Sequence, residues 1–232
     1  MNLFYQPLLS EGVSYLDADE SKHAVRVLRK NVGDVIRLID GKGFFYDASI
    51  TKADAAKCQF TITSQTADVK NNYSIHIAIS PTKNTDRIEW FVEKAVEIGV
   101  DKITLVACQK SERVHFKMDR LERVAVSAMK QSLKATLPQI SGIDKLNDII
   151  KRNTEQQKFI AYVDQTNPDH LKNLITPGSS YLVLIGPEGD FSEGELALAL
   201  QNNFKKVSLG KSRLRTETAG VAACHILNLF NS

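Results

Sequence analysis

The sequence predicts an α/β protein of two parts, a small N-terminal β-barrel domain and a larger domain built on a mostly parallel sheet. Residues 1–70 consist mostly of short β-favouring runs separated by turn signals. From Ser74 onward, apolar strand-like runs alternate with helical patterns, which is typical of a parallel sheet covered on both faces. The polar segment 68–72 separates the two patterns. We therefore predict domains at 1–70 and 73–232.

The N-terminal domain is predicted to combine short strands with one helix. Strands are expected at 35–39, 44–50 and 58–63, and the turn signal Asp40-Gly41-Lys42-Gly43 joins the first two. The helix is expected at 19–28, where Asp19 is a suitable cap.

The second domain is predicted from strand runs and helix-start signals. Asp86 and Glu89 form a capping-box pattern for a helix that ends at Gly99, and Ser192 and Glu195 form another for a helix that ends near 202. Further helices are expected at 119–135 and 218–230, and strands at 75–79, 102–107, 159–163, 181–185 and 207–209.

The composition is that of a folded globular chain. Of the 232 residues, 43% are hydrophobic and 25% are charged. The three cysteines form no CxxC pair, and no set of His, Cys, Asp and Glu has metal-ligand spacing, so we expect neither disulfides nor a metal. The N-terminal segment lacks the regions of a signal peptide, and no run has the length of a membrane span. We therefore expect a cytoplasmic protein with no membrane partner.

Positive charge is concentrated in the second half of the chain. The formal net charge is only +3, but residues 110–134 carry seven Lys and Arg against three Asp and Glu, and residues 205–215 carry five against none. This distribution favours a phosphate-rich partner, although a solvated basic face is the commoner explanation of a single run.

The helix expected at 119–135 places a polar stripe on one face. A solvated surface explains such a stripe as well as a row of phosphate contacts does. Unpaired cations repel one another, and a purely structural surface normally relieves this repulsion with Glu at i+4, which favours nucleic acid as the partner. The stripe comprises Arg120, Arg123, Ser127, Lys130, Gln131 and Lys134.

Two glycine-containing turns near the C-terminus are the strongest candidates for a ligand site. The first glycine turn, residues 184–192, contains Gly186-Pro187-Glu188-Gly189, and the second, residues 207–220, contains Gly210 and Leu214-Arg215-Thr216-Glu217-Thr218. Each follows an expected strand, and ligands bind at the carboxyl ends of strands in α/β sheets. Their spacing matches neither the dinucleotide fingerprint nor the P-loop.

Each turn has a structural and a functional interpretation. The glycines and Pro187 alone explain a rigid turn, but they also let the backbone approach a flat ligand, with Glu188 directed at a sugar hydroxyl or a reacting group. Thr216 or Thr218 is a suitable cap for the last helix, whereas Arg215 and Glu217 flank its entrance, where free N–H groups already favour negative charge.

Other polar and aromatic residues carry weaker signals. His23, with Arg26, Arg29 and Lys30 nearby, is interpreted either as a basic edge that faces RNA or as ordinary surface. The remaining candidates lie in apolar surroundings and are predicted to be core residues, namely His76, His225 and Trp90.

The two glycine turns, taken with motifs elsewhere, resemble the RsmE family of SPOUT RNA methyltransferases. The turns supply Gly186-Pro187-Glu188-Gly189 with Ser192, and Leu209-Gly210 with Leu214-Arg215-Thr216-Glu217-Thr218-Ala219. Asp86-Arg87 before the segment 93–100, and Gln131-Ser132 before Leu137-Pro138, are similar to helices of its methyltransferase domain. The segments 23–29, 33–34 and 40–43 resemble its PUA-like RNA-binding domain. Asp190 stands where this family commonly has a second glycine.

The resemblance implies the activity and the fold. It implies S-adenosylmethionine as methyl donor and N3 of one uridine in 16S ribosomal RNA of the small subunit as acceptor. It also implies a PUA-like domain at 1–70, a deep trefoil knot in a SPOUT domain at 73–232, and a homodimer whose active site uses both chains. A non-catalytic RNA-binding or ribosome-assembly protein on the same fold is the alternative, and a small-molecule nucleotide enzyme is a third.

Site residues follow from the matched motifs and the chemistry of the reaction. We expect Glu217 or, second, Glu188 to act as general base and Arg215 to stabilise charge on the uracil oxygens. The residues expected to hold the cofactor are Ile185, Gly186, Pro187, Gly189, Leu209, Gly210, Leu214, Thr216, Thr218 and Ala219. Those expected to contact RNA are His23, Arg26, Arg29, Lys30, Arg120, Arg123, Lys130, Lys134, Lys211 and Arg213.

Overall fold

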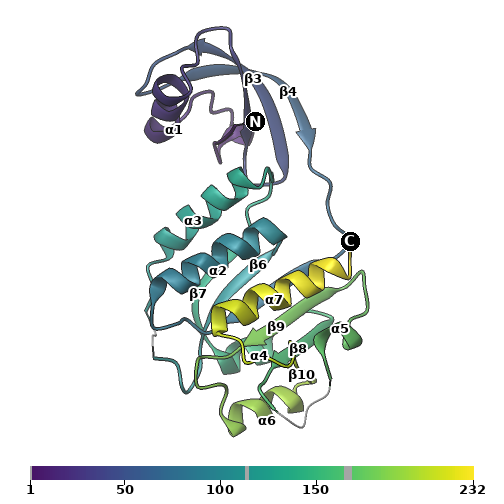
Figure 1. The fold of residues 1–232 in the computed structure, drawn as a ribbon. Helices are drawn as coiled ribbons and strands as arrows, with labels where there is room; N and C mark the ends of the chain where they lie inside the picture. The colour runs from purple at the N-terminus through teal and green to yellow at the C-terminus, as the bar shows by residue number, and fades with distance from the viewer. Residues whose placement is uncertain (1, 113–114, 165–168) are drawn as a thin grey trace. The chain divides into compact units, whose positions relative to one another are not determined.

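The protein is represented by a computed structural model that describes residues 2–112, 115–164 and 169–232 (Figure 1). The chain divides into two compact units. The first contains Met1–Lys70 and Val126–Leu137, and the second contains Asn71–Ala125 and Pro138–Ser232. The helix α3 (Met118–Gln131) therefore contributes to both units, and the sequence did not predict that its second half groups with the N-terminal residues.

The first unit is organised around a four-stranded sheet in the order β1-β2-β3-β4. β1 runs parallel to β2, whereas the other two pairs are antiparallel. Large buried side chains such as Phe4, Leu38 and Phe60 form its core. The strands are β1 (Leu3–Tyr5), β2 (Val35–Ile39), β3 (Phe44–Lys52) and β4 (Gln59–Ala67). β1 was not predicted, because three residues carry too little periodicity to be recognised.

The helix expected at 19–28 is present in two segments. The α-helix α1 (Ala18–Lys22) continues directly into a π-helix, His23–Val27, and a short 3-10 helix, Leu9–Glu11, precedes both. Asp17, not the predicted Asp19, caps α1, since its carboxylate accepts from the backbone N–H of Glu20 at 2.8 Å.

The second unit contains a six-stranded sheet in the order β10-β8-β9-β5-β6-β7. Every neighbouring pair is parallel, which confirms the predicted parallel sheet. The strands are β5 (Ser74–Ile79), β6 (Lys102–Ala107), β7 (Gln139–Lys145), β8 (Gln157–Ala161), β9 (Ser180–Ile185) and β10 (Lys205–Val207). β7 was not predicted, and β10 begins and ends two residues earlier than expected.

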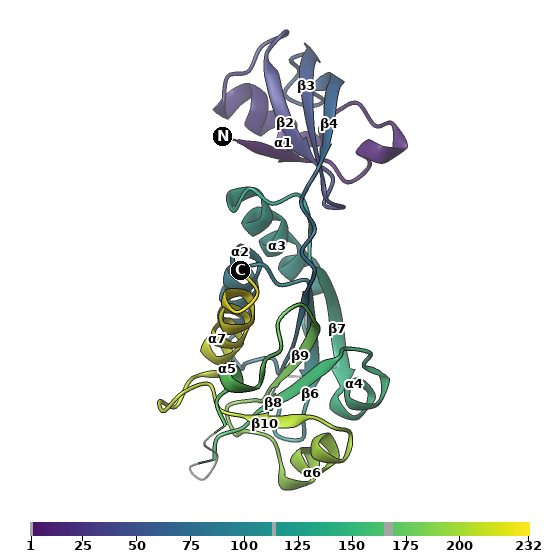
Figure 2. The same ribbon diagram turned by 90° about the vertical axis from the view of Figure 1, so that its right-hand side faces the viewer.

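Helices cover both faces of this sheet (Figure 2). α2 (Thr85–Ile98) and α7 (Thr216–Leu229) pack against each other on one face, where Phe91 and Ile79 meet Gly220. α4 (Leu146–Arg152) and α6 (Glu193–Gln201) pack on the other face, against strand residues such as Ala78 and Leu182, and α5 (Leu171–Leu174) lies near α7. No helix in the three described ranges is long and apolar enough to cross a membrane.

The helix boundaries test the capping predictions. Ser192 and Glu195 form the predicted capping box of α6, and Gly99, with φ of +123°, ends α2 as predicted. The predicted box at Asp86 and Glu89 is wrong, because the side chain of Asn84 caps α2 by accepting from the backbone N–H of Asp86.

Two other predicted boundaries also need correction. α3 ends at Gln131 instead of 135, and Leu133, with φ of +57°, lies in the left-handed region that interrupts a helix. α7 begins at Thr216, two residues before the predicted start, with Arg215 at the N-cap position and no side-chain cap.

The contact at Gly220 determines how closely α7 approaches the sheet and α2. A Cβ atom at this position would lie 2.6 Å and 2.8 Å from ring carbons of Phe91 and 3.0 Å from Cδ1 of Ile79. Both neighbours are fully buried, so neither can yield without repacking. Only glycine therefore permits this helix spacing.

We predict that Gly220→Ala lowers the free energy of unfolding by about 1–3 kcal/mol, because the added methyl group overpacks the core. Urea unfolding followed by circular dichroism measures the change. The matched control is Gly194→Ala in α6, where a Cβ meets nothing within 4 Å. There the substitution should be neutral or stabilising by up to about 1 kcal/mol. Equal effects of the two substitutions would contradict the packing argument.

A buried polar network joins the amino-terminal ends of several strands in the second unit. His76 donates through Nδ1 to Oε1 of Glu155 at 2.6 Å, and its Nε2 lies 2.8 Å from Oγ1 of Thr104. The Thr104 hydroxyl in turn lies 2.8 Å from that of Ser141. His76 is a core histidine, as predicted, whereas His225 is exposed and that prediction was wrong.

The carboxylate of Glu155 makes this network sensitive to pH. Burial by itself raises the pKa of Glu155, but the hydrogen bond and charge of His76 and the backbone N–H of Thr154 outweigh it, so the pKa lies below its ordinary value of 4.5. A carboxyl group whose pKa is lower in the folded state stabilises the fold above its unfolded pKa. That stabilisation is lost as the pH falls through the folded value.

We predict that Glu155→Gln lowers the free energy of unfolding by about 1–2 kcal/mol at pH 7, since a charged hydrogen-bond acceptor becomes neutral. The difference from the unsubstituted protein should shrink as the pH falls below 4.5. Denaturant unfolding at a series of pH values measures this. Glu193→Gln, at an exposed carboxylate, is the control and should show no such trend. A difference that stays constant from pH 7 to pH 3 would refute the assignment.

Candidate functional site

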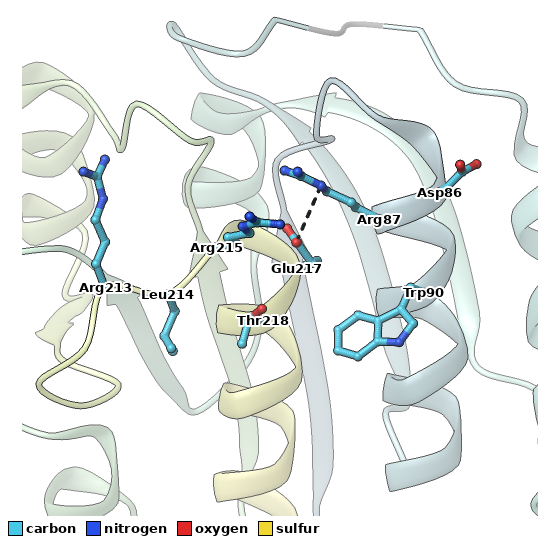
Figure 3. Close-up of a pocket in the computed structure, with 8 residues that line it drawn as sticks. All are labelled: Asp86, Arg87, Trp90, Arg213, Leu214, Arg215, Glu217 and Thr218. Atoms are coloured by element: carbon cyan, nitrogen blue, oxygen red, sulfur yellow. Dashed lines mark ion pairs between the residues drawn. The ribbon is translucent and has the colours of Figure 1, made fainter.

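A pocket of about 570 Å³ opens where α2 and α7 begin (Figure 3). The first turn of α7 and the segment before it form one side, and the first turns of α2 form the other. The lining residues are Asp86, Arg87, Trp90, Arg213, Leu214, Arg215, Glu217 and Thr218. Five of them belong to the second glycine turn, so the structure brings this part of the predicted site together.

Glu217 is the buried acidic group of this pocket. Its side chain is 9% exposed, and its Oε1 lies 3.8 Å from Nε of Arg87, as the dashed line in Figure 3 marks. Its Oε2 is buried and has no hydrogen-bond partner among the described residues. A buried carboxylate oxygen without a partner is costly, so it is available to accept a hydrogen bond from a bound molecule.

Three pocket residues on α2 were not predicted as site residues, namely Asp86, Arg87 and Trp90. Trp90 was predicted to be a core residue, but it is 43% exposed and lines the pocket one turn after Arg87. The signal was their spacing of three residues, which places both on one side of α2. An aromatic side chain and a cation at a pocket opening are suited to a planar or charged ligand.

The first glycine turn is connected to the start of α7 by a hydrogen bond. The Thr216 hydroxyl donates to the carbonyl oxygen of Gly186 at 3.1 Å. The interpretation of Thr216 as the cap of α7 is therefore wrong, because Arg215 occupies the N-cap position. Ile185 and Pro187 are buried, whereas Glu188 and Gly189 are exposed. None of these four residues lines the pocket.

The second glycine turn combines an open backbone with exposed cations. Gly210 has φ of +131°, and a Cβ there would meet nothing within 4 Å. Leu209 and Leu214 are half-buried, and Ala219 and Thr218 follow in α7. The exposed basic residues are Lys211, Arg213 and Arg215. The backbone around Gly210 is therefore free to approach a ligand.

The basic stripe of α3 differs from its prediction. Nε of Arg120 lies 2.6 Å from Oε1 of Glu89, and its Nη2 lies 3.5 Å from Oδ1 of Asp86. Lys130 forms an ion pair with Glu20. The interpretation that the stripe is unpaired is therefore wrong for these two cations. Their partners come from other helices, so a pattern read along α3 alone does not reveal them. Arg123 donates to a backbone carbonyl, and Lys134 is half-buried.

The other predicted RNA contacts lie in the first unit, around the π-helix. Arg26 and Arg29 are exposed, and Arg29 has φ of +54°. Lys30 donates to a backbone carbonyl, and the His23 ring lies 6.1 Å from that of Phe4. Within the described part of the chain, no cluster of His, Cys, Asp and Glu could hold a metal ion.

Family comparisons define the class of this protein. The pattern of an RNA methyltransferase domain matches residues 69–228, and that of an RNA methyltransferase PUA domain matches residues 16–63. The fold is thus that of an RNA methyltransferase with an N-terminal PUA domain. More narrowly, the chain belongs to the RsmE family, as its glycine-turn motifs indicated.

Individual relatives resemble the chain over almost its whole length. A solved structure of a probable rRNA-methyltransferase from Porphyromonas gingivalis is 44% identical, with 99% of each chain covered and a TM-score of 0.93. Ribosomal RNA small subunit methyltransferase E of Aquifex aeolicus is 28% identical over 99% of this chain and 100% of its own. The Neisseria gonorrhoeae enzyme of the same name, solved with S-adenosyl methionine bound, is 27% identical, with 100% and 98% covered and a TM-score of 0.85.

We predict that Arg87 and Glu217 are energetically coupled. Arg87→Met should lower the free energy of unfolding by about 1–2 kcal/mol, because it leaves the buried Glu217 carboxylate without its cation. In the Glu217→Gln background the same substitution should cost less than about 0.5 kcal/mol. A double-mutant cycle by urea unfolding measures the coupling. Fully additive effects would show that the 3.8 Å approach contributes nothing.

Proposed function

We propose that this protein transfers the methyl group of S-adenosylmethionine to N3 of a uridine in 16S ribosomal RNA. The observation that carries the proposal is the buried Glu217 carboxylate, with an unpartnered oxygen, in a pocket between two helix starts. The matched family patterns and the names of the relatives support the same activity.

The two glycine turns have the features that a nucleoside-containing cofactor needs. Gly210 leaves open space beside the backbone, and Leu214 supplies apolar surface. The two turns follow the carboxyl ends of the parallel strands β9 and β10. S-adenosylmethionine supplies an electrophilic methyl group on its sulfonium. We propose that its binding residues are Ile185, Gly186, Pro187, Gly189, Leu209, Gly210, Leu214, Thr216, Thr218 and Ala219.

The chain's own side chains would prepare the uracil ring. N3 of uridine carries a proton that must be removed before N3 can attack the methyl group, and we propose that Glu217, which lines the pocket, accepts it. Arg215, which lines the same pocket, would stabilise the negative charge that then develops on the uracil oxygens. Glu188 is the second candidate base, but it is exposed and does not line the pocket.

Cations of both units would bind the RNA backbone. We propose phosphate contacts for His23, Arg26, Arg29, Lys30, Arg120, Arg123, Lys130, Lys134, Lys211 and Arg213. The exposed residues among them fit this role best, whereas Arg120 and Lys130 would have to exchange carboxylate partners for phosphate. Family resemblance further supports domains at 1–70 and 73–232, a trefoil knot in the second, a homodimer whose active site uses both chains, and a cytoplasmic location.

We predict that Glu217→Gln lowers kcat by about 10²–10⁴-fold, the usual contribution of a general base, and that Arg215→Ala lowers it by about 10²-fold. Both variants should still bind S-adenosylmethionine in calorimetry. Transfer of a labelled methyl group to purified small subunits, followed by mapping of the modified base, measures the activity.

Two matched controls separate chemistry from general effects of charge. Glu193→Gln, also in the first turn of a helix, and Arg152→Ala, at the end of α4, are exposed and should retain full activity. Near-normal turnover by both Glu217→Gln and Arg215→Ala would overturn the roles. A wild-type protein that binds RNA but shows no heat with S-adenosylmethionine would favour the non-catalytic alternative.

A further inference from the structure

Asp190 occupies an unusual backbone position in the first glycine turn. Its φ is +58°, in the left-handed region that favours glycine and that Asp and Asn tolerate better than other residues. Its carboxylate accepts two backbone hydrogen bonds, from Phe191 at 2.8 Å through Oδ1 and from Val163 at 3.0 Å through Oδ2. Because Val163 follows β8, this side chain connects the turn after β9 to the end of the neighbouring strand.

Lys110 holds the same turn from the other side of β9, two strands away across β5. It follows β6, and its Nζ donates to the carbonyl oxygens of Gly189 at 2.9 Å and Phe191 at 3.4 Å. These two carbonyls flank Asp190. The Lys110 stem also lies against Gly189, where a Cβ would come within 3.3 Å of Cδ. A cation and an anion from different loops therefore fix consecutive peptide groups of one turn.

Hydrogen bonds connect this turn to the start of α7, which lines the pocket. The backbone N–H of Asp190 donates to the carbonyl of Pro187 at 2.9 Å and closes the turn. The preceding residue, Gly186, accepts from Thr216 in the first turn of α7, which also carries Glu217. Movement of residues 189–191 would therefore displace both the glycine backbone and the helix start that lines the pocket.

We propose that Asp190 and Lys110 are positioning residues that fix the first glycine turn for S-adenosylmethionine. This inference rests on the proposed function. A glycine at this position would adopt the same left-handed conformation. It would lack the carboxylate that accepts hydrogen bonds from Phe191 and Val163. Neither side chain needs to touch the cofactor, since each acts through the backbone that does.

The test compares variants of the full-length protein that remove one part of this arrangement. Asp190→Gly keeps the backbone conformation and removes both acceptors, Asp190→Asn keeps one acceptor, and Lys110→Met removes the ammonium. Titration calorimetry gives the Kd for S-adenosylmethionine, steady-state assays give kcat and the KM for each substrate, and thermal unfolding gives Tm. Loss of charge-assisted hydrogen bonds at the binding turn should raise the Kd about ten-fold for Asp190→Gly and Lys110→Met, and less for Asp190→Asn. The KM for RNA should not change.

Two controls carry equivalent hydrogen bonds away from the site. Nζ of Lys158 donates to the carbonyl of Asn202 at 2.8 Å, so Lys158→Met matches Lys110→Met. The Gln157 side chain makes two hydrogen bonds with the backbone of Thr176, so Gln157→Ala matches Asp190→Gly. Both controls should lower Tm without changing the Kd for S-adenosylmethionine.

The possible outcomes are distinguishable. If Asp190→Gly and Lys110→Met lower Tm but leave the Kd within two-fold of wild type, the residues are structural only and the inference is wrong. If wild-type protein shows no binding of S-adenosylmethionine, the proposed function fails and this inference fails with it. Should Asp190→Gly not fold, Asp190→Asn and Lys110→Met decide the question.

Discussion

The candidate site depends on how closely α7 packs against α2 and β5. Gly220 leaves room for the Phe91 ring and the Ile79 side chain, which a Cβ would approach at 2.6–3.0 Å. With the helix at this distance, Thr216 reaches the carbonyl of Gly186, and the Glu217 carboxylate comes to lie beside Arg87. A larger spacing would separate the carboxylate from its cation and the helix start from the glycine turn. One packing contact in the core thus determines the geometry of polar groups a full helical turn away.

The two edges of the parallel sheet use polar side chains differently. At the amino-terminal edge, His76 links Glu155 to Thr104 in a network that is almost completely buried and has its hydrogen bonds made. Such a network stabilises one arrangement of the strands and leaves nothing for a ligand. At the carboxyl edge, the charged groups of Lys110 and Asp190 form hydrogen bonds with backbone groups. The pocket, in contrast, retains an unpartnered carboxylate oxygen at Glu217. The unsatisfied group lies where ligands bind in sheets of this kind.

Local sequence predicted what local forces determine. The strand at 102–107 and the Ser192–Glu195 capping box are present as predicted, because apolar runs and side-chain-to-backbone hydrogen bonds act over a few residues. The predictions were wrong where residues distant in the sequence determine the environment of a side chain. Trp90 is apolar but borders a pocket formed with α7, and Arg120 is paired by carboxylates of α2 that a pattern along α3 does not contain. The site motifs of the second glycine turn were found, whereas Arg87 was not, since only the tertiary fold brings it to Glu217.

The environments of the two candidate bases argue for different roles. Glu188 is exposed in the first glycine turn, where water solvates its charge and weakens any interaction with a substrate. Glu217 is buried beside Arg87, and its Oε2 accepts no hydrogen bond from any of the described residues. A carboxylate in that position gains most from a donor supplied by the substrate, and the N3–H of uracil is such a donor. In the proposed reaction this carboxylate would accept the N3 proton, with Nε of Arg87 3.8 Å from its Oε1 and with Arg215 lining the same pocket.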